Sequence, residues 1–257
     1  MAVNYEIKSQ LAKLLATEDL VVEHKNIDTA QFNVQTRVLT LPMWDKASNF
    51  VYDMLVGHEV GHALYTPNED PPQDVPHSFI NVTEDARIEK LMKRKYAGMS
   101  KTFFRGYQEL NSDDFFELEE VDVNKMNLAD KANLFFKIGN FIDINFNLAE
   151  RQIVDMISAA ETFDDAVDAA RTLYEFCKEE QKKAAEAFCP PNPTSEGGQQ
   201  SADVEEESPD QGEGTAEAEK QESEQDSPNE TESYGGTAEL EMEDPSVFTD
   251  ETLQSKL

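Results

Sequence analysis

The pentapeptide His58-Glu59-Val60-Gly61-His62 is the most informative stretch of this chain, because the residues before it predict a buried helix. Val51, Leu55, His58 and His62 follow the i, i+4, i+7, i+11 spacing of a helix face that packs on a core. Side chains four residues apart project from the same side of a helix, so both imidazoles can reach one metal ion. The pattern therefore predicts a metal site on the inner face of this helix.

Each polar residue of the pentapeptide has an expected role. His58 and His62 are expected to bind Zn²⁺ through ring nitrogens. Glu59 lies beside them, where a carboxylate can take a proton from a water molecule and act as a general base. A chance match would instead leave two ordinary helix histidines and a solvated glutamate. The position of both histidines on the predicted buried face favours the metal site.

A zinc site needs a third protein ligand, with water in the fourth position if the site is catalytic. The metzincin pattern places Gly and His three and six residues after the second histidine, where this chain has Tyr65 and Asn68, so that class is excluded. The other known arrangement takes a carboxylate from a second helix downstream. Glu84, which lies 22 residues after His62, is our first choice for this ligand, and Asp85 is the alternative.

The acidic segment around Glu84 offers further polar groups. Asp85 and Glu89 are i, i+4 neighbours, so both can accept hydrogen bonds from the ligand imidazoles. Arg87 either pairs with Glu84 or is an ordinary surface arginine of a charged helix. His77 is either a ligand or simply a histidine at the end of a loop.

The remaining pattern predicts an α+β, mostly α fold, with a zincin-like metallopeptidase core. The run Arg37–Leu41 alternates as a strand does and leads into the predicted helix. In zincin peptidases such a strand commonly borders the cleft and can pair with an extended substrate. We expect this core over residues 1–125, and a helical subdomain over 126–189 built from the stretches 127–146 and 148–188.

The end of the chain differs in composition from the rest. Residues 190–257 hold 20 of the 53 acidic residues but only 2 of the 22 basic ones, with few aliphatic side chains. Such a segment cannot bury enough apolar surface to offset chain entropy, so we expect a disordered acidic tail. The stretch Pro245–Leu257 is either a short docking motif or, as we expect, a frayed terminus. The tail could also recruit a protein partner.

Net charge and apolar runs exclude several classes. The formal charge of −31 disfavours direct binding to nucleic acid, because phosphates would be repelled. No secretory signal and no apolar run of membrane-spanning length is visible, so we expect a soluble, cytoplasmic protein without a membrane partner.

Two runs of this sequence resemble peptidase-like proteins of large tailed phages. They are the run from His58 to Pro67 and the run INVTEDARIEKLMKRKYAG from Ile80 to Gly98. The phage proteins carry an HEVGHAL…TP segment, an N-x-x-E-D-A-R-I-E segment and a long acidic linker, and then a von Willebrand factor A (VWA) domain. The second run is also similar to an element of the cobaltochelatase CobT-like family. The resemblance covers residues 30–120, and the tail by composition only.

The resemblance implies Zn²⁺ held by His58, His62 and a carboxylate of the Glu84–Asp85 pair, with Glu59 as general base. A phage origin would place the protein in the cytoplasm of the infected host or in the virion. The chain departs from the family because the D-x-S-x-S turn of a VWA domain does not occur in it. We therefore expect no VWA domain here.

These observations lead to three functional hypotheses. The first is a gluzincin-like zinc metallopeptidase that hydrolyses a peptide or protein substrate with a metal-activated water. The second is a non-catalytic metal-binding scaffold whose acidic tail recruits a partner. The third, which rests on family analogy alone, is a chelatase-like subunit that acts with an AAA ATPase.

Overall fold

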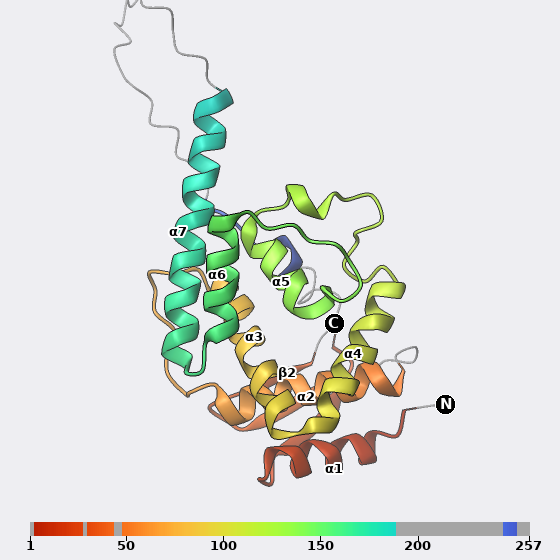
Figure 1. The fold of residues 1–257 in the computed structure, drawn as a ribbon. Helices are drawn as coiled ribbons and strands as arrows, with labels where there is room; N and C mark the ends of the chain where they lie inside the picture. Colours follow the sequence, from red (N-terminus) through yellow and green to blue (C-terminus); the bar gives the residue numbers. More distant parts are fainter. Residues whose placement is uncertain (1–2, 28–29, 44–47, 189–243, 251–257) are drawn as a thin grey trace, which may run out of the picture. The chain divides into compact units, whose positions relative to one another are not determined.

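The fold is mostly helical with one small sheet, as the sequence predicts (Figure 1). The structure is a computed structural model, which describes residues 3–27, 30–43, 48–188 and 244–250. In chain order its elements are α1 (Tyr5–Ala16), β1 (Val21–Lys25), β2 (Gln31–Asn33), β3 (Val38–Pro42), α2 (Asn49–Tyr65), α3 (His77–Lys95), α4 (Ala97–Ser112), the 3-10 helix η1 (Val123–Lys125), α5 (Leu128–Ile138), α6 (Leu148–Ala159) and α7 (Phe163–Phe188).

The sheet has the order β1-β3-β2, with β1 parallel and β2 antiparallel to β3. The predicted strand Arg37–Leu41 corresponds to β3, which begins one residue later because Arg37 adopts a left-handed turn conformation with φ 57°. Since β3 is paired on both sides, it cannot pair with a substrate. That part of the prediction was wrong: β1 and β2 are the edge strands, and Gln31 and Phe32 of β2 line the cleft described below.

Helix α2, which carries the pentapeptide, is surrounded by α1, α3, α4 and β2. The hydroxyl of Ser48 caps its start by accepting from the backbone N–H groups of Phe50 and Val51. At its other end the guanidinium of Arg37 donates to the carbonyl of Ala63. That bond pairs one of the carbonyls left open at a helix C-terminus. The helix that presents the histidines is therefore fixed at both ends.

Two hydrophobic clusters lie on either side of α3. The first joins α1, the sheet, α2 and α4, with Tyr52, Phe103 and Phe116 among its fully buried side chains. The second joins the start of α3 to α5, α6 and α7 around Phe79 and Leu173. Helix α3 contributes to both clusters, so it connects the part of the chain that carries the pentapeptide to the C-terminal helices.

The two predicted helical stretches differ from the helices observed. The stretch 127–146 is helical only as far as Ile138, and the stretch 148–188 is divided into two helices. Helix α5 ends at Ile138, and the stretch up to the next helix is non-helical. Asn147 then starts α6 with a capping box that it shares with Glu150. The second stretch is split between α6 and α7, where the side chain of Asp165 accepts from the backbone N–H of Thr162. These polar caps define where α6 and α7 begin.

The end of the described chain packs against the helices. In the segment Asp244–Asp250, Val247 and Thr249 are fully buried, and Val247 belongs to the second hydrophobic cluster. The expectation of a frayed terminus over Pro245–Leu257 was therefore wrong for residues 245–250. The alternative, a docking motif, applies to them, and the surface on which they dock belongs to the same chain. The remainder of the expected disordered tail, residues 190–243 and 251–257, lies outside the described residues.

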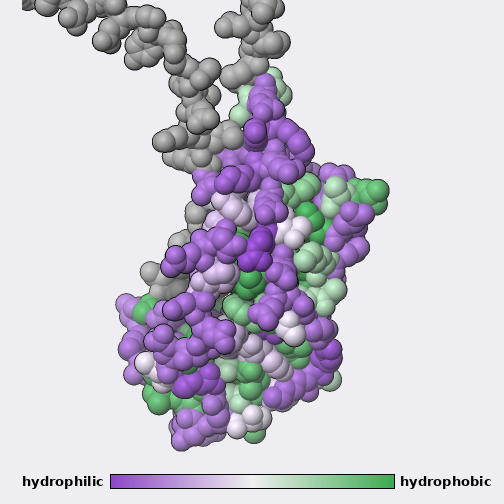
Figure 2. All heavy atoms as spheres, turned by 90° about the vertical axis from the view of Figure 1, so that its left-hand side faces the viewer, coloured by the Kyte–Doolittle hydropathy of each residue, from purple (hydrophilic) through white to green (hydrophobic). Residues whose placement is uncertain are grey.

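All of the residues that the structure describes belong to one compact unit. Figure 2 shows that the face around α6 and α7 is mainly hydrophilic, with scattered hydrophobic side chains between. Scattered apolar groups of this kind are ordinary on exposed surfaces. None of the helices described is both long and apolar enough to cross a membrane.

Candidate metal centre

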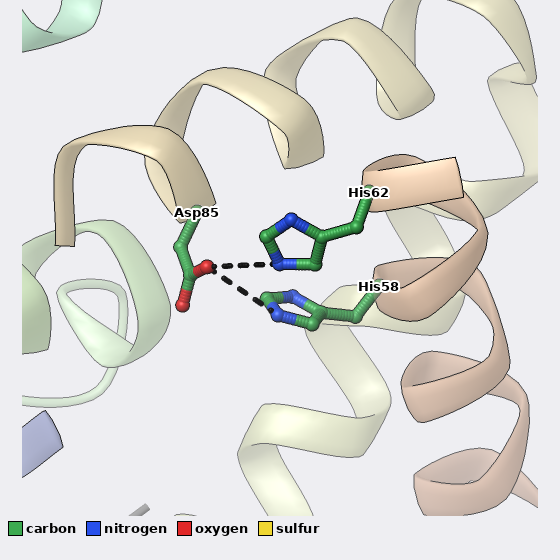
Figure 3. A group of neighbouring side chains, drawn as sticks. All are labelled: His58, His62 and Asp85. Atoms are coloured by element: carbon green, nitrogen blue, oxygen red, sulfur yellow. Dashed lines mark ion pairs between the residues drawn. The ribbon is translucent and has the colours of Figure 1, made fainter. Parts of the chain in front are cut away.

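Three side chains from two helices, α2 and α3, point towards one another (Figure 3). Nε2 of His58 and Nε2 of His62, both on α2, lie 3.5 and 3.3 Å from Oδ1 of Asp85 on α3. All three atoms lie within 4.8 Å of one another. Ligands at about 2.0–2.1 Å around a tetrahedral zinc ion are about 3.3 Å apart, so the set has the spacing of a metal site.

The outer nitrogen of His58 is held by a carboxylate. Its Nδ1 lies 3.2 Å from Oε1 of Glu89, which also accepts from the hydroxyl of Tyr107. The second oxygen of Glu89 accepts from Lys93 at 3.1 Å. An ionised carboxylate can only accept, so Nδ1 of His58 carries a proton and Nε2 is the nitrogen left for a metal. Glu89 therefore has the acceptor role that the i, i+4 spacing predicts.

The outer nitrogen of His62 is held through a hydroxyl. Its Nδ1 lies 3.0 Å from Oγ1 of Thr66, which in turn donates to Oε1 of Glu84 at 2.6 Å. Because the threonine hydroxyl gives its proton to Glu84, it accepts from His62, and Nε2 of His62 is again free to face the cluster. Outer partners of this kind fix the tautomer and the ring orientation of metal-binding histidines.

Glu84, the first choice for the third ligand, faces elsewhere. Arg87 binds its carboxylate with two nitrogens, Nε to Oε2 and Nη2 to Oε1, each at 2.7 Å. Arg87 also donates to the carbonyl of Tyr65 at the end of α2. Successive helix residues are rotated by about 100°. That rotation turns Glu84 towards Thr66 and Arg87, and Asp85 towards the two histidines, so the structure groups the alternative residue and not the first choice.

Asp85 is also bound by a lysine that the sequence does not single out. Lys137, in the last turn of α5, donates to Oδ2 of Asp85 at 2.7 Å, and both side chains are buried. The lysine follows Phe135 and Phe136 in an apolar run. An ionisable residue within such a run is the signal that could have drawn attention to it.

The charges in the cluster shift the pKa values of its members. Burial lowers the pKa of His58, but Asp85 and Glu89 outweigh burial and raise that pKa to about 9. For Asp85, burial would raise the pKa, and Lys137 and His58 together bring it well below its usual range. The cluster therefore holds a proton on His58 opposite an ionised Asp85, which is the position a divalent cation would take by displacing that proton.

Glu59 lies beside the cluster but is not part of it. Its side chain is buried, and the backbone N–H of Phe32 in β2 donates to it. Burial raises the pKa of Glu59, and the nearby His58 and His62 offset this only in part. A carboxylate with a raised pKa is better matched to accepting a proton near neutral pH.

A cleft of about 590 Å³ gives access to this group. His58, Glu59, His62 and Asp85 line it, together with residues from β2, the loop after α2, the first turns of α3 and the C-terminal segment. His77 lies in this wall as the first residue of α3, outside the three-residue group. The cleft is therefore bounded by parts of the chain that are far apart in the sequence.

Comparison with protein-family profiles, with curated proteins and with solved structures finds no significant match to this chain.

Proposed function

We propose that this chain is a zinc-dependent metallopeptidase whose ligands are His58, His62 and Asp85. The observation that supports it most is the convergence of Nε2, Nε2 and Oδ1 on one point at the wall of a cleft. Two imidazoles and one carboxylate are a donor set that suits zinc and leaves a fourth position open. The third ligand is an aspartate, so the site is a variant of the gluzincin arrangement.

The hydrogen-bond partners of the three proposed ligands also fit a bound metal ion. Each ligand has a partner on its far side: Glu89 for His58, Thr66 for His62 and Lys137 for Asp85. A metal ion bound there would act as a Lewis acid towards a peptide carbonyl and would lower the pKa of a water molecule. The chain supplies the positions of the ligands and the partners that orient them.

Glu59 would move the proton. Its carboxylate lies in the same wall of the cleft as the two histidines, on the turn of α2 between them. It accepts a proton from the attacking water and passes it to the leaving amine nitrogen. The backbone N–H of Phe32 holds the carboxylate in place from β2.

The test is hydrolysis of a mixed peptide library by the zinc-loaded full-length chain and by Glu59→Gln. The variant should keep its zinc and lose about 10²- to 10⁴-fold in rate. Glu6→Gln, at an exposed position of α1, is the matched control and should cleave as the wild type does. Equal rates for the wild type and Glu59→Gln would reject this mechanism. Zinc binding without hydrolysis would favour the scaffold hypothesis instead.

A further inference from the structure

The two oxygens of Asp85 have different neighbours. Oδ1 faces both histidines of α2, at 3.5 and 3.3 Å from their Nε2 atoms. Oδ2 points away from them and accepts from Nζ of Lys137 at 2.7 Å. The side chains of this ion pair are only 2% and 9% exposed, so water does not compete for the second oxygen. In this arrangement a single oxygen of Asp85 is available to a metal ion.

Lys137 reaches the cluster from another part of the fold. It lies on α5, whereas the ligands lie on α2 and α3. Its ammonium group forms a buried ion pair with the carboxylate of Asp85. A buried ion pair is usually no more stabilising than a well-packed apolar pair. Stability alone therefore does not explain why a lysine is found here.

We propose that Lys137 is a positioning residue that limits Asp85 to one-oxygen ligation of the metal. The inference rests on the proposed function, because it takes Asp85 as the third ligand. Without the ammonium group, Oδ2 could turn towards the metal and fill the position that a water molecule or a substrate carbonyl needs. The packing of α5 against α3 would then determine the coordination number of the site.

The charge of Lys137 makes this role separable from a structural one. The ammonium group repels a divalent cation, so its removal should not weaken metal binding. Its removal should instead change the geometry of the site and lower the rate. Loss of a partner that orients a ligand typically costs about 10- to 100-fold in affinity or activity, and here we expect the loss in activity.

The experiment uses the full-length chain with Co²⁺ in place of Zn²⁺, since the visible spectrum of cobalt reports coordination number. Lys137→Met should shift the spectrum from a four-coordinate to a five-coordinate form, bind cobalt at least as tightly as the wild type and cleave peptides about 10- to 100-fold more slowly. Lys137→Arg keeps a charged donor and should restore the four-coordinate spectrum. Lys131→Met is the matched control, because Lys131 is a buried lysine of α5 that pairs with Glu150 at 2.8 Å, away from the cleft.

The outcomes distinguish the two proposals. A wild type that binds no cobalt overturns the proposed function and this inference with it. A wild type that binds cobalt while Lys137→Met gives an unchanged spectrum overturns the inference alone. A Lys137→Met variant that folds, by its thermal unfolding curve, but loses cobalt also overturns it, because a positioning role predicts retained metal. If Lys137→Met does not fold, a five-coordinate spectrum for Lys137→Arg decides against the inference.

Discussion

The two sides of α3 differ in how they contribute to the candidate site. On the side towards α2, the partners of α3 belong to a sequence motif, His58-Glu59-Val60-Gly61-His62, that is recognisable without a structure. On the side towards α5, the partner is a single lysine, Lys137, 52 residues away from Asp85 and outside any motif. Local spacing shows which side chains share a helix face, and only the packed fold shows what lies opposite that face.

The largest expected effect is the loss of zinc on replacing Asp85, the residue of α3 that contacts both α2 and α5. Asp85→Ala removes the oxygen between the two histidines and should abolish stoichiometric zinc binding, because two imidazoles alone leave the site incomplete. Glu84→Gln should keep its zinc, since Glu84 faces Arg87. Metal analysis after dialysis measures both. Zinc that survives Asp85→Ala and is lost in Glu84→Gln would reverse the assignment.

The second effect concerns stability on the α2 side. Arg87→Met leaves the buried Glu84 without its two-nitrogen partner and should lower the free energy of unfolding by about 3–5 kcal/mol. Urea denaturation measures the change. Arg94→Met is the control, because Arg94 lies on the same helix but pairs with an exposed Glu161, for which about 0–1 kcal/mol is expected. Similar losses for both variants would show that burial of the Glu84 pair does not matter.

A smaller loss is expected on the α5 side. The Thr249 hydroxyl donates to Asp130 at 2.8 Å and accepts from Asn133 at 3.0 Å, and both partners are on α5. Thr249→Val removes these bonds and should cost about 1–3 kcal/mol in urea denaturation. Ser246→Ala, at an exposed position of the same segment, should change stability by less than about 0.5 kcal/mol. No loss in Thr249→Val would mean that the segment does not stay docked in solution.

The last effect is a dependence on pH, which is small within any one pH unit. His58 has a pKa raised to about 9, so its contribution to the stability of the metal-free protein is complete below pH 6.5 and is lost as the pH rises through 9. A metal ion must displace this proton, so zinc affinity should rise about tenfold per pH unit up to about pH 9 and then level off. Calorimetric titration in two buffers of different ionisation enthalpy measures the affinity and the proton released. An affinity that is flat between pH 7 and 9 would contradict the assignment.

The sequence identified part of the site because helical spacing is a local property. The positions of His58 and His62 on one face, and of Glu89 as an acceptor for an imidazole, follow from residues four apart. The choice between Glu84 and Asp85 depends instead on how α3 is rotated against α2. That contact is close at Gly61, where an added Cβ would lie 3.2 Å from Cδ1 of Ile88. Such a rotation is set by packing across the interface, which spacing along the chain does not encode.

The docked segment Asp244–Asp250 gives the acidic stretch before it a second attachment to the folded unit. Phe188 and Asp244, which flank the 55 residues Cys189–Glu243, belong to the same compact unit, so the chain returns to that unit after this stretch. The entropic cost of closing a loop grows by only about 0.6 kcal/mol for each doubling of its length, so this stretch can be lengthened or shortened at little cost. A protease that cuts within this stretch should give two fragments on a denaturing gel that still elute together under native conditions, because Val247 and Thr249 hold the shorter fragment.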